Sequence, residues 1–462
     1  MAAIFGYFPS WPKIKPGFFL AVGISLLMIQ VLFLSNLSYL YGTQFKESER
    51  THNLNILYVD YDGGIIGQSV IDAYHLLEGN TFPTIRHLPT ENFPAPIDVR
   101  NAVCSGDYWG AIYALPDASD SLAAALVNGS STVTPTTLAY VWNGARYAAY
   151  SQSAIYANIV TLIQTTRSTY YANNASDTLL SDVTALGVFV DPIHAQEINI
   201  KSTNQGTRVL YNSVSMIMPI IMQFFFMMAL NGISAQYRLF SKLSWVMNGL
   251  IRMCVSVLYT LVSSLCMIGY IWGFKEDWAV NGAQFVLSWM TVWLYMHINF
   301  LLFDIMTTFI PMQFMPFCIL TWMITNVAST IAPFELSPGF YRWGYALPAH
   351  EAYSILGQIW SNGCNNQLHR ALPILFSWWV VGACVVVYAL HYRCRQARIL
   401  ERKTQILENA VDENQEDRPK TPAGSPDRIL PRDRRSTMES IELERRVYGP
   451  QYPTMPGTFD NR

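Results

Sequence analysis

Long apolar segments are unevenly distributed along this chain of 462 residues. One segment lies near the N-terminus, a stretch of mixed polarity follows, and five more lie close together in the second half. A helix needs about 20 apolar residues to cross the hydrocarbon core of a bilayer. The pattern therefore predicts a polytopic α-helical membrane protein with six transmembrane helices in a one-plus-five arrangement, at residues 18–41, 212–233, 253–273, 284–303, 312–332 and 372–392.

The stretch 42–211 has the pattern of an α/β domain that is inserted after the first span. An apolar run at 53–60 ends in an Asp-Gly-Gly turn signal, and a helical segment follows at 65–78. Further strand candidates alternate with helical stretches. This alternation predicts a mixed sheet that is covered by helices.

Basic residues orient the chain in the membrane. Lys13 and Lys15, in the segment 1–17, favour a cytoplasmic N-terminus, which makes the α/β domain extracytoplasmic. The last span is followed by a basic group that indicates the cytoplasmic side: Arg393, Arg395, Arg398, Arg402 and Lys403. Because the tail 393–462 is charged, contains prolines and has few large apolar residues, we expect it to be disordered.

The composition agrees with a membrane protein. Of all residues, 51% are hydrophobic and only 13% are charged, whereas about 25% are charged in soluble proteins. The net charge of −2 does not favour nucleic acid as a partner.

Four sequence segments carry a resemblance to a known family. They read LYVDYDGGIIGQSV, YWGAIYALPDASDSLAAAL, YVWNGARY and FYRWGYALPAHEAY, and they occur in this order along the chain. Together with the one-plus-five layout, they resemble the fungal nitrosoguanidine-resistance membrane proteins. The resemblance implies that residues 212–392 form a five-helix membrane domain related to ABC-2-type permeases. It also implies a role in drug tolerance or in the distribution of lipids at the plasma membrane.

The sequence carries no motif for ATP hydrolysis or for another reaction. It has no G-x-x-x-x-G-K-[ST] phosphate loop, no H-E-x-x-H and no C-x-x-C. We therefore expect no enzyme activity, no cofactor and no metal site. A permease of this kind needs a separate ATPase, an ion gradient or a passive mechanism.

Polar residues and prolines inside the spans are candidates for a substrate path, because polarity within a bilayer is expensive and often functional. His297 and Asn299 lie in the fourth span, and Gln313 lies in the fifth. Pro311 and Pro316 kink or start the fifth span and open room between helices. The alternative for His297 is a hydrogen bond to a neighbouring helix.

Other charges are interpreted as markers of the membrane boundary. Asp304 stands at the inner end of the fourth span, and we interpret it as an interface charge. The segment between the second and third spans is amphipathic, with Arg238, Lys242 and Arg252 on its polar side. It is either an ordinary interfacial loop or a coupling helix that contacts a partner.

The loop 333–371 after the fifth span is rich in aromatic residues that suit the bilayer interface, and it predicts a hairpin that dips into the membrane. His350-Glu351 suggests acid–base chemistry, but without a partner in view the pair is better explained by a structural role. The residues of this outer-loop motif are Arg342, Trp343, Tyr345, Pro348, His350 and Glu351.

Five residues are candidates for covalent modification. Asn128 and Asn174 begin glycosylation sequons in the extracytoplasmic domain. Cys104 and Cys364 are both predicted on the oxidising side, so a disulfide between them is left open. Cys394 lies between two arginines after the last span and is a candidate for palmitoylation.

The leading hypothesis is a permease-like protein of the plasma membrane that exports hydrophobic small molecules or redistributes membrane lipids. The alternative is a non-transporting regulator or scaffold of lipid asymmetry or of a partner transporter. Expected partners are membrane lipids, hydrophobic small molecules, and a separate ATPase or a second copy of the chain.

Overall fold

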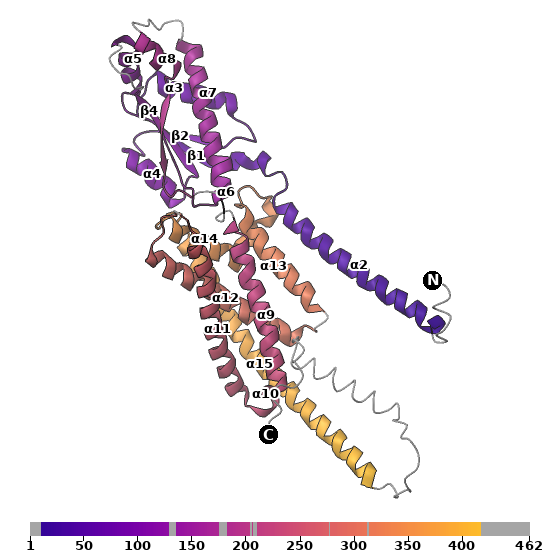
Figure 1. Cartoon of the computed structure of the whole chain (residues 1–462). Helices are drawn as coiled ribbons and strands as arrows, with labels where there is room; N and C mark the ends of the chain where they lie inside the picture. Colours follow the sequence, from indigo (N-terminus) through magenta and orange to yellow (C-terminus); the bar gives the residue numbers. More distant parts are fainter. Residues whose placement is uncertain are drawn as a thin grey trace.

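The computed structural model describes residues 11–128, 135–174, 183–203, 206, 210–276, 278–311 and 314–416. It has two parts, an α/β domain and a bundle of long helices, stacked along one axis (Figure 1). We call the end of the bundle next to the α/β domain the outer end, and we call the opposite end the inner end.

The bundle and its N-terminal helix contain five helices that are long and apolar enough to cross a membrane, as expected of a polytopic helical membrane protein. The helices of this part are α2 (Trp11–Thr43), α9 (Val214–Gln236), α10 (Leu239–Lys242), α11 (Trp245–Gly273), α12 (Gly282–Phe309), α13 (Met315–Ile331), η5 (Gly339–Ala346), α14 (Pro348–Trp360) and α15 (Leu368–Glu416).

The predicted fifth span is shorter than expected. It corresponds to α13, which has only 17 residues and is not among the five long helices. At 1.5 Å per residue this helix is about 26 Å long, less than the roughly 30 Å of a hydrocarbon core. Pro311 follows the end of α12, and Pro316 lies in the first turn of α13, so prolines set the start of this short helix.

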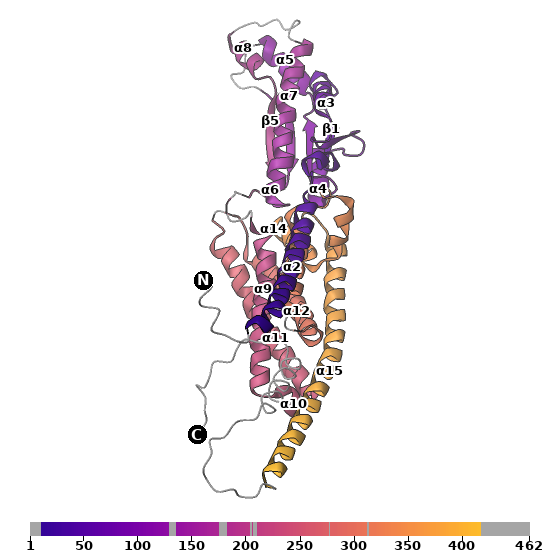
Figure 2. The ribbon, with the colours of Figure 1, turned by 90° about the vertical axis from the view of Figure 1, so that its right-hand side faces the viewer.

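Helix α12 is the central helix of the bundle and packs against α9, α11, α14 and α15. By contrast, α2 leans outward and contacts the bundle through α13 and the η5 loop (Figures 1 and 2). Asn36 Nδ2 donates a hydrogen bond to Thr321 Oγ1 at 3.2 Å. The Tyr39 ring lies 5.2 Å from the Tyr341 ring and 5.8 Å from the Trp343 ring.

The α/β domain has a mixed five-stranded sheet in the order β2-β1-β3-β4-β5. All neighbouring strands are parallel except β3 and β4, which are antiparallel. The strands are β1 (Asn55–Asp60), β2 (Thr84–Leu88), β3 (Gly110–Ala114), β4 (Thr136–Trp142) and β5 (His194–Asn199).

Helices cover both faces of this sheet. Helices α3, α5 and α7 bury one face, and α4 buries the other, because the central strands carry apolar side chains on both sides. The helices of the domain are η1 (Ser48–Asn53), α3 (Ile65–Leu77), α4 (Pro96–Ser105), α5 (Ala118–Asn128), α6 (Ala148–Tyr150), η2 (Ser151–Tyr156), α7 (Ala157–Asn174) and α8 (Val183–Val190).

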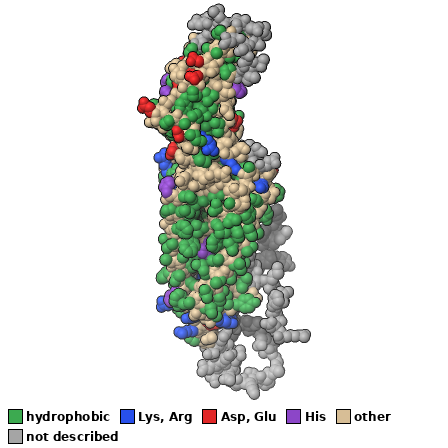
Figure 3. Space-filling model, turned by 90° about the vertical axis from the view of Figure 1, so that its left-hand side faces the viewer, with side chains coloured by type: hydrophobic (Ala, Val, Ile, Leu, Met, Phe, Trp, Pro, Cys, Tyr) green, Lys and Arg blue, Asp and Glu red, His purple; other side chains and the backbone are tan. Residues whose placement is uncertain are grey.

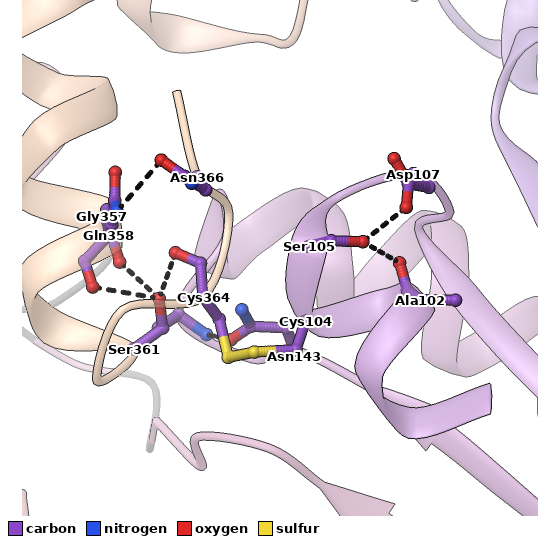
Figure 4. Close-up of a disulfide and its surroundings, with 11 residues drawn as sticks. Ala102, Cys104, Ser105, Asp107, Asn143, Gly357, Gln358, Ser361, Cys364 and Asn366 are labelled. Atoms are coloured by element: carbon purple, nitrogen blue, oxygen red, sulfur yellow. Dashed lines mark hydrogen bonds between the residues drawn. A yellow bond between two sulfur atoms is a disulfide. The ribbon is translucent and has the colours of Figure 1, made fainter. Parts of the chain in front are cut away.

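A disulfide joins the α/β domain to the bundle. Cys104 of α4 and Cys364, in the loop after α14, are bonded across a sequence separation of 260 residues (Figure 4). Ser361 holds this loop by donating a hydrogen bond to the Gly357 carbonyl at 2.6 Å. Asn365 N donates a further hydrogen bond to the Cys104 carbonyl. The structure thus brings together the two cysteines whose pairing the sequence left open.

The predicted disorder of the tail is wrong for its first part. Residues 393–416 continue α15 as a helix. The reason is that Leu390, Ala397 and Leu400 recur at helical spacing and pack with Phe240 of α10. Residues 417–462 lie outside the described part of the chain, so disorder there stays a prediction.

Candidate functional site

Three charged side chains meet inside the inner end of the bundle. Arg252 of α11 binds Asp304 of α12 through two hydrogen bonds, Nη2 to Oδ1 at 2.7 Å and Nε to Oδ2 at 3.3 Å. Arg393 of α15 approaches the same carboxylate from the other side, with Nη1 at 3.3 Å from Oδ1. Their side chains are only 6%, 6% and 1% exposed, in the order Arg252, Asp304, Arg393. We call these three residues the charge cluster.

Polar groups on neighbouring helices surround the charge cluster. Asn231 Oδ1 of α9 accepts hydrogen bonds from Arg252 Nη2 at 3.2 Å and from Arg393 Nη1 at 3.4 Å. Arg393 Nη2 donates to Thr307 Oγ1 at 2.9 Å, and Arg252 Nη1 donates to Ser234 Oγ at 3.4 Å. The cluster therefore joins α9, α11, α12 and α15 at one point.

A single aromatic ring lies against both arginines. Phe240 of the short helix α10 is fully buried, and its ring centroid lies 5.4 Å from Cζ of Arg252 and 5.1 Å from Cζ of Arg393. A ring face at this distance attracts a cation. Helix α10 thus covers the cluster as the connection between α9 and α11.

A second polar group lies in the middle of the bundle around His297. Its Nδ1 accepts a hydrogen bond from Trp379 Nε1 of α15 at 2.8 Å, and its Nε2 lies 3.3 Å from Ser256 Oγ of α11. Two residues further along α12, the side-chain oxygen of Asn299 accepts a hydrogen bond from Trp322 Nε1 of α13 at 2.8 Å. His297 and Asn299 are 3% and 0% exposed, so both connect neighbouring helices.

Gln223 of α9 is different, because it is fully buried and neither its amide oxygen nor its amide nitrogen has a hydrogen-bond partner among the described residues. The next turns of α9 reach α12, where the Phe226 ring lies 6.1 Å from the Phe300 ring. A buried amide without a partner is costly. Gln223 is therefore the one fully buried amide of α9 that leaves hydrogen-bonding capacity inside the bundle unused.

The other predicted path residues lie away from these groups. Pro311 and Pro316 lie at the connection between α12 and α13, where Pro316 is in the first turn of α13. Gln313 lies outside the described residues. His297 and Asn299 therefore both lie on α12 but contact different helices. The two prolines mark the inner end of α13.

The outer-loop motif forms a second buried charged site at the outer end. Glu351 of α14 is fully buried and accepts a hydrogen bond from Arg370 Nε at 3.0 Å. Burial raises the pKa of Glu351 to about 7, although Arg370 opposes the shift. His350 is buried, its Nδ1 lies 2.8 Å from the Ser329 carbonyl, and burial lowers its pKa to about 4.

The rest of the motif packs around this pair. The Tyr345 ring lies 4.7 Å from Cζ of Arg370 and 5.0 Å from the ring of His350. Pro348 begins α14, which is buried along almost its whole length. Arg342 and Trp343 are exposed. The loop thus forms a packed cap in which His350 and Glu351 have structural partners.

The modification candidates lie at different places. Asn128 ends α5 and Asn174 ends α7, but their side chains and the residues that complete the sequons lie outside the described part, so glycosylation stays a prediction. Cys394 is only 2% exposed and packs near Asn248, whose Nδ2 lies 3.7 Å from its Sγ. Burial of this thiol does not favour the predicted palmitoylation.

The charge cluster was missed by reasoning from the sequence, which interpreted Asp304 and the two arginines as boundary charges. One signal was available. Between residues 210 and 311, outside the short connection 274–277, Asp304 is the only acidic residue. Such an intramembrane acid calls for a buried cation. The described residues contain no group of His, Cys, Asp or Glu that could hold a metal ion.

Comparison with known proteins supports the same class. The chain is 23% identical over 338 residues to an uncharacterized endoplasmic reticulum membrane protein of Saccharomyces cerevisiae; the match covers 68% of the chain and 65% of that relative, which is less than two thirds of its length. No solved structure matches the chain. Together with the long apolar helices, this relative supports a multi-pass membrane protein.

The match to a family model is more extensive. It runs over residues 25–384, from the first apolar helix to the middle of α15, and so includes both the α/β domain and the bundle. Because it covers most of the chain, the protein belongs to the family described as protein of unknown function DUF3533.

Proposed function

We propose that the chain is a permease-like membrane protein that exports hydrophobic compounds or changes the distribution of lipids between the two leaflets. The observation that carries the proposal is the series of buried polar side chains inside the bundle. These side chains are Gln223, His297 and Asn299 in the middle of the bundle and the charge cluster at its inner end. Polar groups at such depth often mark the path of a substrate.

The resemblance to nitrosoguanidine-resistance proteins and to ABC-2-type permeases supports the same proposal. Because the sequence has no phosphate loop, the energy for export comes from a separate ATPase, from a second protein that maintains a gradient, or from the substrate's own gradient. A second copy of the chain is a further candidate partner.

The second candidate function is a non-transporting regulator or scaffold. It is favoured by one observation: both nitrogens of His297 and the carbonyl oxygen of Asn299 already have partners within the bundle. Polar residues of this kind can serve helix packing alone. In that case the α/β domain binds a partner and the bundle anchors it.

We propose a membrane of the secretory pathway as the location. The resemblance implies the plasma membrane, whereas the name of the yeast relative supports the endoplasmic reticulum as the alternative. Fluorescence microscopy of the tagged chain with markers for both membranes decides between them.

The test of transport is the movement of fluorescent lipids and of a hydrophobic dye in proteoliposomes, with and without ATP or a proton gradient. Gln223→Leu is the informative variant, because the Gln223 amide has no hydrogen-bond partner to lose among the described residues. We expect the variant to be at least as stable as the wild type, and to move substrate about tenfold more slowly, which corresponds to one lost hydrogen bond.

Met222→Leu is the matched control, because it changes the neighbouring side chain without adding or removing a hydrogen-bonding group. Folded wild-type protein that moves neither lipid nor dye under any condition contradicts transport and favours the regulator. Unchanged movement by the Gln223→Leu variant removes Gln223 from the path.

A further inference from the structure

The charge cluster is not balanced in charge. Two guanidinium groups, those of Arg252 and Arg393, share the one carboxylate of Asp304, and all three side chains are buried. A buried charge is strongly unfavourable unless an opposite charge compensates it. One positive charge therefore remains without an acidic partner among the described residues around it.

The excess charge belongs to Arg393. Arg252 holds Asp304 through two hydrogen bonds, one to each carboxylate oxygen, and bidentate pairs of a guanidinium with a carboxylate are strong. Arg393 reaches the same carboxylate through one hydrogen bond only, and its Nε has no hydrogen-bond partner among the described residues, although the side chain is 1% exposed. One buried donor of Arg393 is thus available for a ligand.

The inner end around this donor is basic. In the stretches 210–273, 278–311 and 368–406, the only acidic residues are Asp304 and Glu401. In Figure 3, Lys and Arg side chains lie at the lower edge of the broad apolar surface of the bundle, and others lie above it next to the α/β domain. The basic side chains of α10, its flanks and α15 in this region are Arg238, Lys242, Arg395, Arg398, Arg402 and Lys403. Their combined field attracts an anion, and apart from Asp304 these stretches hold one carboxylate, that of Glu401.

The depth of the cluster indicates which anion arrives there. Asp304 lies five residues before the end of α12, and Arg252 lies seven residues after the start of α11. At 1.5 Å per residue these positions are about 8–11 Å inside the helix ends, near the boundary between headgroups and acyl chains. On the same helices, Leu250, two residues before Arg252, and Val387, six residues before Arg393, are exposed and suit acyl chains.

We propose that the charge cluster binds the phosphate group of a lipid headgroup. The phosphate accepts a hydrogen bond from Nε of Arg393, and a second one from Nη2 in exchange for the bond of Nη2 to Thr307 Oγ1. It neutralises the charge of Arg393, while Asp304 keeps its pair with Arg252. Guanidinium groups match phosphate oxygens in this two-pronged way. Phe240 and α10 lie over the site, so α10 shifts when the ligand enters.

This inference rests on the proposed function in taking a lipid as the ligand, so binding and transbilayer movement are measured separately. Binding without movement keeps the site and contradicts transport. Movement without binding at Arg393 keeps transport and overturns this inference.

The binding experiment uses the purified full-length chain in detergent and its thermal unfolding temperature. The probes are dioctanoyl phosphatidic acid, dioctanoylglycerol, which lacks the phosphate, and inorganic phosphate. We expect phosphatidic acid to raise the unfolding temperature saturably, dioctanoylglycerol to have no effect, and inorganic phosphate to act only weakly. A shift by inorganic phosphate equal to that of phosphatidic acid overturns the lipid as the source. No shift with phosphatidic acid overturns the site.

Variants test whether phosphatidic acid raises the unfolding temperature by binding at the charge cluster. We expect Arg393→Gln to weaken the response to phosphatidic acid by about tenfold or more, as for a lost charged hydrogen bond. Arg395→Gln is the matched control, because it removes the same charge from an exposed neighbour. An equal response of both variants overturns the assignment to Arg393.

A measurement on the wild type keeps the inference testable if the Arg393 variant does not fold. We expect phosphatidic acid to slow or speed amide hydrogen exchange in α10 and the adjacent ends of α9 and α11, with no change in the α/β domain. Unchanged exchange in α10 at a saturating concentration overturns the site.

Discussion

The two ends of the bundle are held together in different ways. At the outer end, the Cys104–Cys364 disulfide and a packed aromatic cap fix the bundle to the α/β domain. At the inner end, the cysteines Cys254 and Cys394 are free, and ionic contacts between four helices hold the structure. Ionic partners can be exchanged for a ligand, whereas a covalent bond cannot. Movement during function is therefore expected at the inner end.

The two ends also differ in how many cations each buried carboxylate has as partners. Glu351 has one cation, Arg370, whose side chain is 31% exposed and retains contact with water. Asp304 has two cations, and both are buried. The outer pair is thus balanced and partly hydrated, while the inner cluster depends on one carboxylate for two arginines.

The largest effect is expected when that carboxylate is neutralised. Asp304→Asn leaves Arg252 and Arg393 buried without an opposite charge, and breaking a buried ion pair costs about 3–5 kcal/mol. We expect a large loss of folded, monodisperse protein and a lower unfolding temperature in size-exclusion and thermal unfolding measurements.

Asp120→Asn is the control for this prediction, since it removes the same charge from an exposed position on α5. Equal unfolding temperatures of the Asp304 and Asp120 variants contradict the view that the cluster holds the inner end together.

Removal of the disulfide is the next largest change and acts on the outer end. Cys104→Ser and Cys364→Ser each open a loop that spans 260 positions, and the loss of a native disulfide typically costs about 2–4 kcal/mol. We expect each single variant to be destabilised as much as the double variant, because the same bond is lost. Non-reducing mass spectrometry of the linked peptides verifies the bond, and Cys384→Ser, a free and exposed cysteine, is the control.

Much of the architecture could be predicted because it follows from short-range patterns of apolar and polar residues. Long apolar runs predicted the crossing helices, and alternating apolar runs and turns predicted the sheet. Strand β5 was missed, because His194–Asn199 is polar and partly exposed and therefore lacks an apolar run. The 17-residue length of α13 was also missed, because the hydropathy of the segment continues across the prolines that set its start.

The site was harder to predict because its residues come from distant parts of the chain. Arg252 lies 52 positions before Asp304, and Arg393 lies 89 positions after it. Each arginine alone is typical of a membrane boundary, so local pattern gives no reason to bury it. Only the packing of α11 and α15 on both sides of α12 brings them to one carboxylate.

A pH titration sharpens the comparison at the outer end, because Glu351 and His350 act in opposite directions. The pKa of Glu351 is raised to about 7, so its contribution to stability is present at low pH and is lost as the pH rises toward 7. The pKa of His350 is lowered to about 4, so its contribution is lost as the pH falls below its ordinary value of 6.5. In the wild type, the fall in stability caused by Glu351 and the rise caused by His350 offset each other as the pH increases.

Glu351→Gln removes the loss of stability that Glu351 causes as the pH rises. We expect the unfolding temperature of this variant to rise from pH 5 to pH 7 by about 2–4 °C more than that of the wild type, as for 1 kcal/mol. Glu91→Gln, at an exposed site, is the control. A pH profile of the Glu351 variant that matches the wild type contradicts the titration of Glu351 in this range.

The smallest effect is expected at α2, whose apolar side chains are exposed along most of the helix. Asn36 donates a hydrogen bond to Thr321 of α13, and a hydrogen bond between membrane helices contributes about 0.6 kcal/mol on average. A double-mutant cycle with Asn36→Leu and Thr321→Val isolates this pair, and we expect a coupling energy of about that size in thermal unfolding. A coupling energy as large as the destabilisation caused by Asp304→Asn would show that α2 is an integral part of the bundle. A small one supports the view that α2 is a weakly attached helix, free to change its angle while the outer end stays fixed.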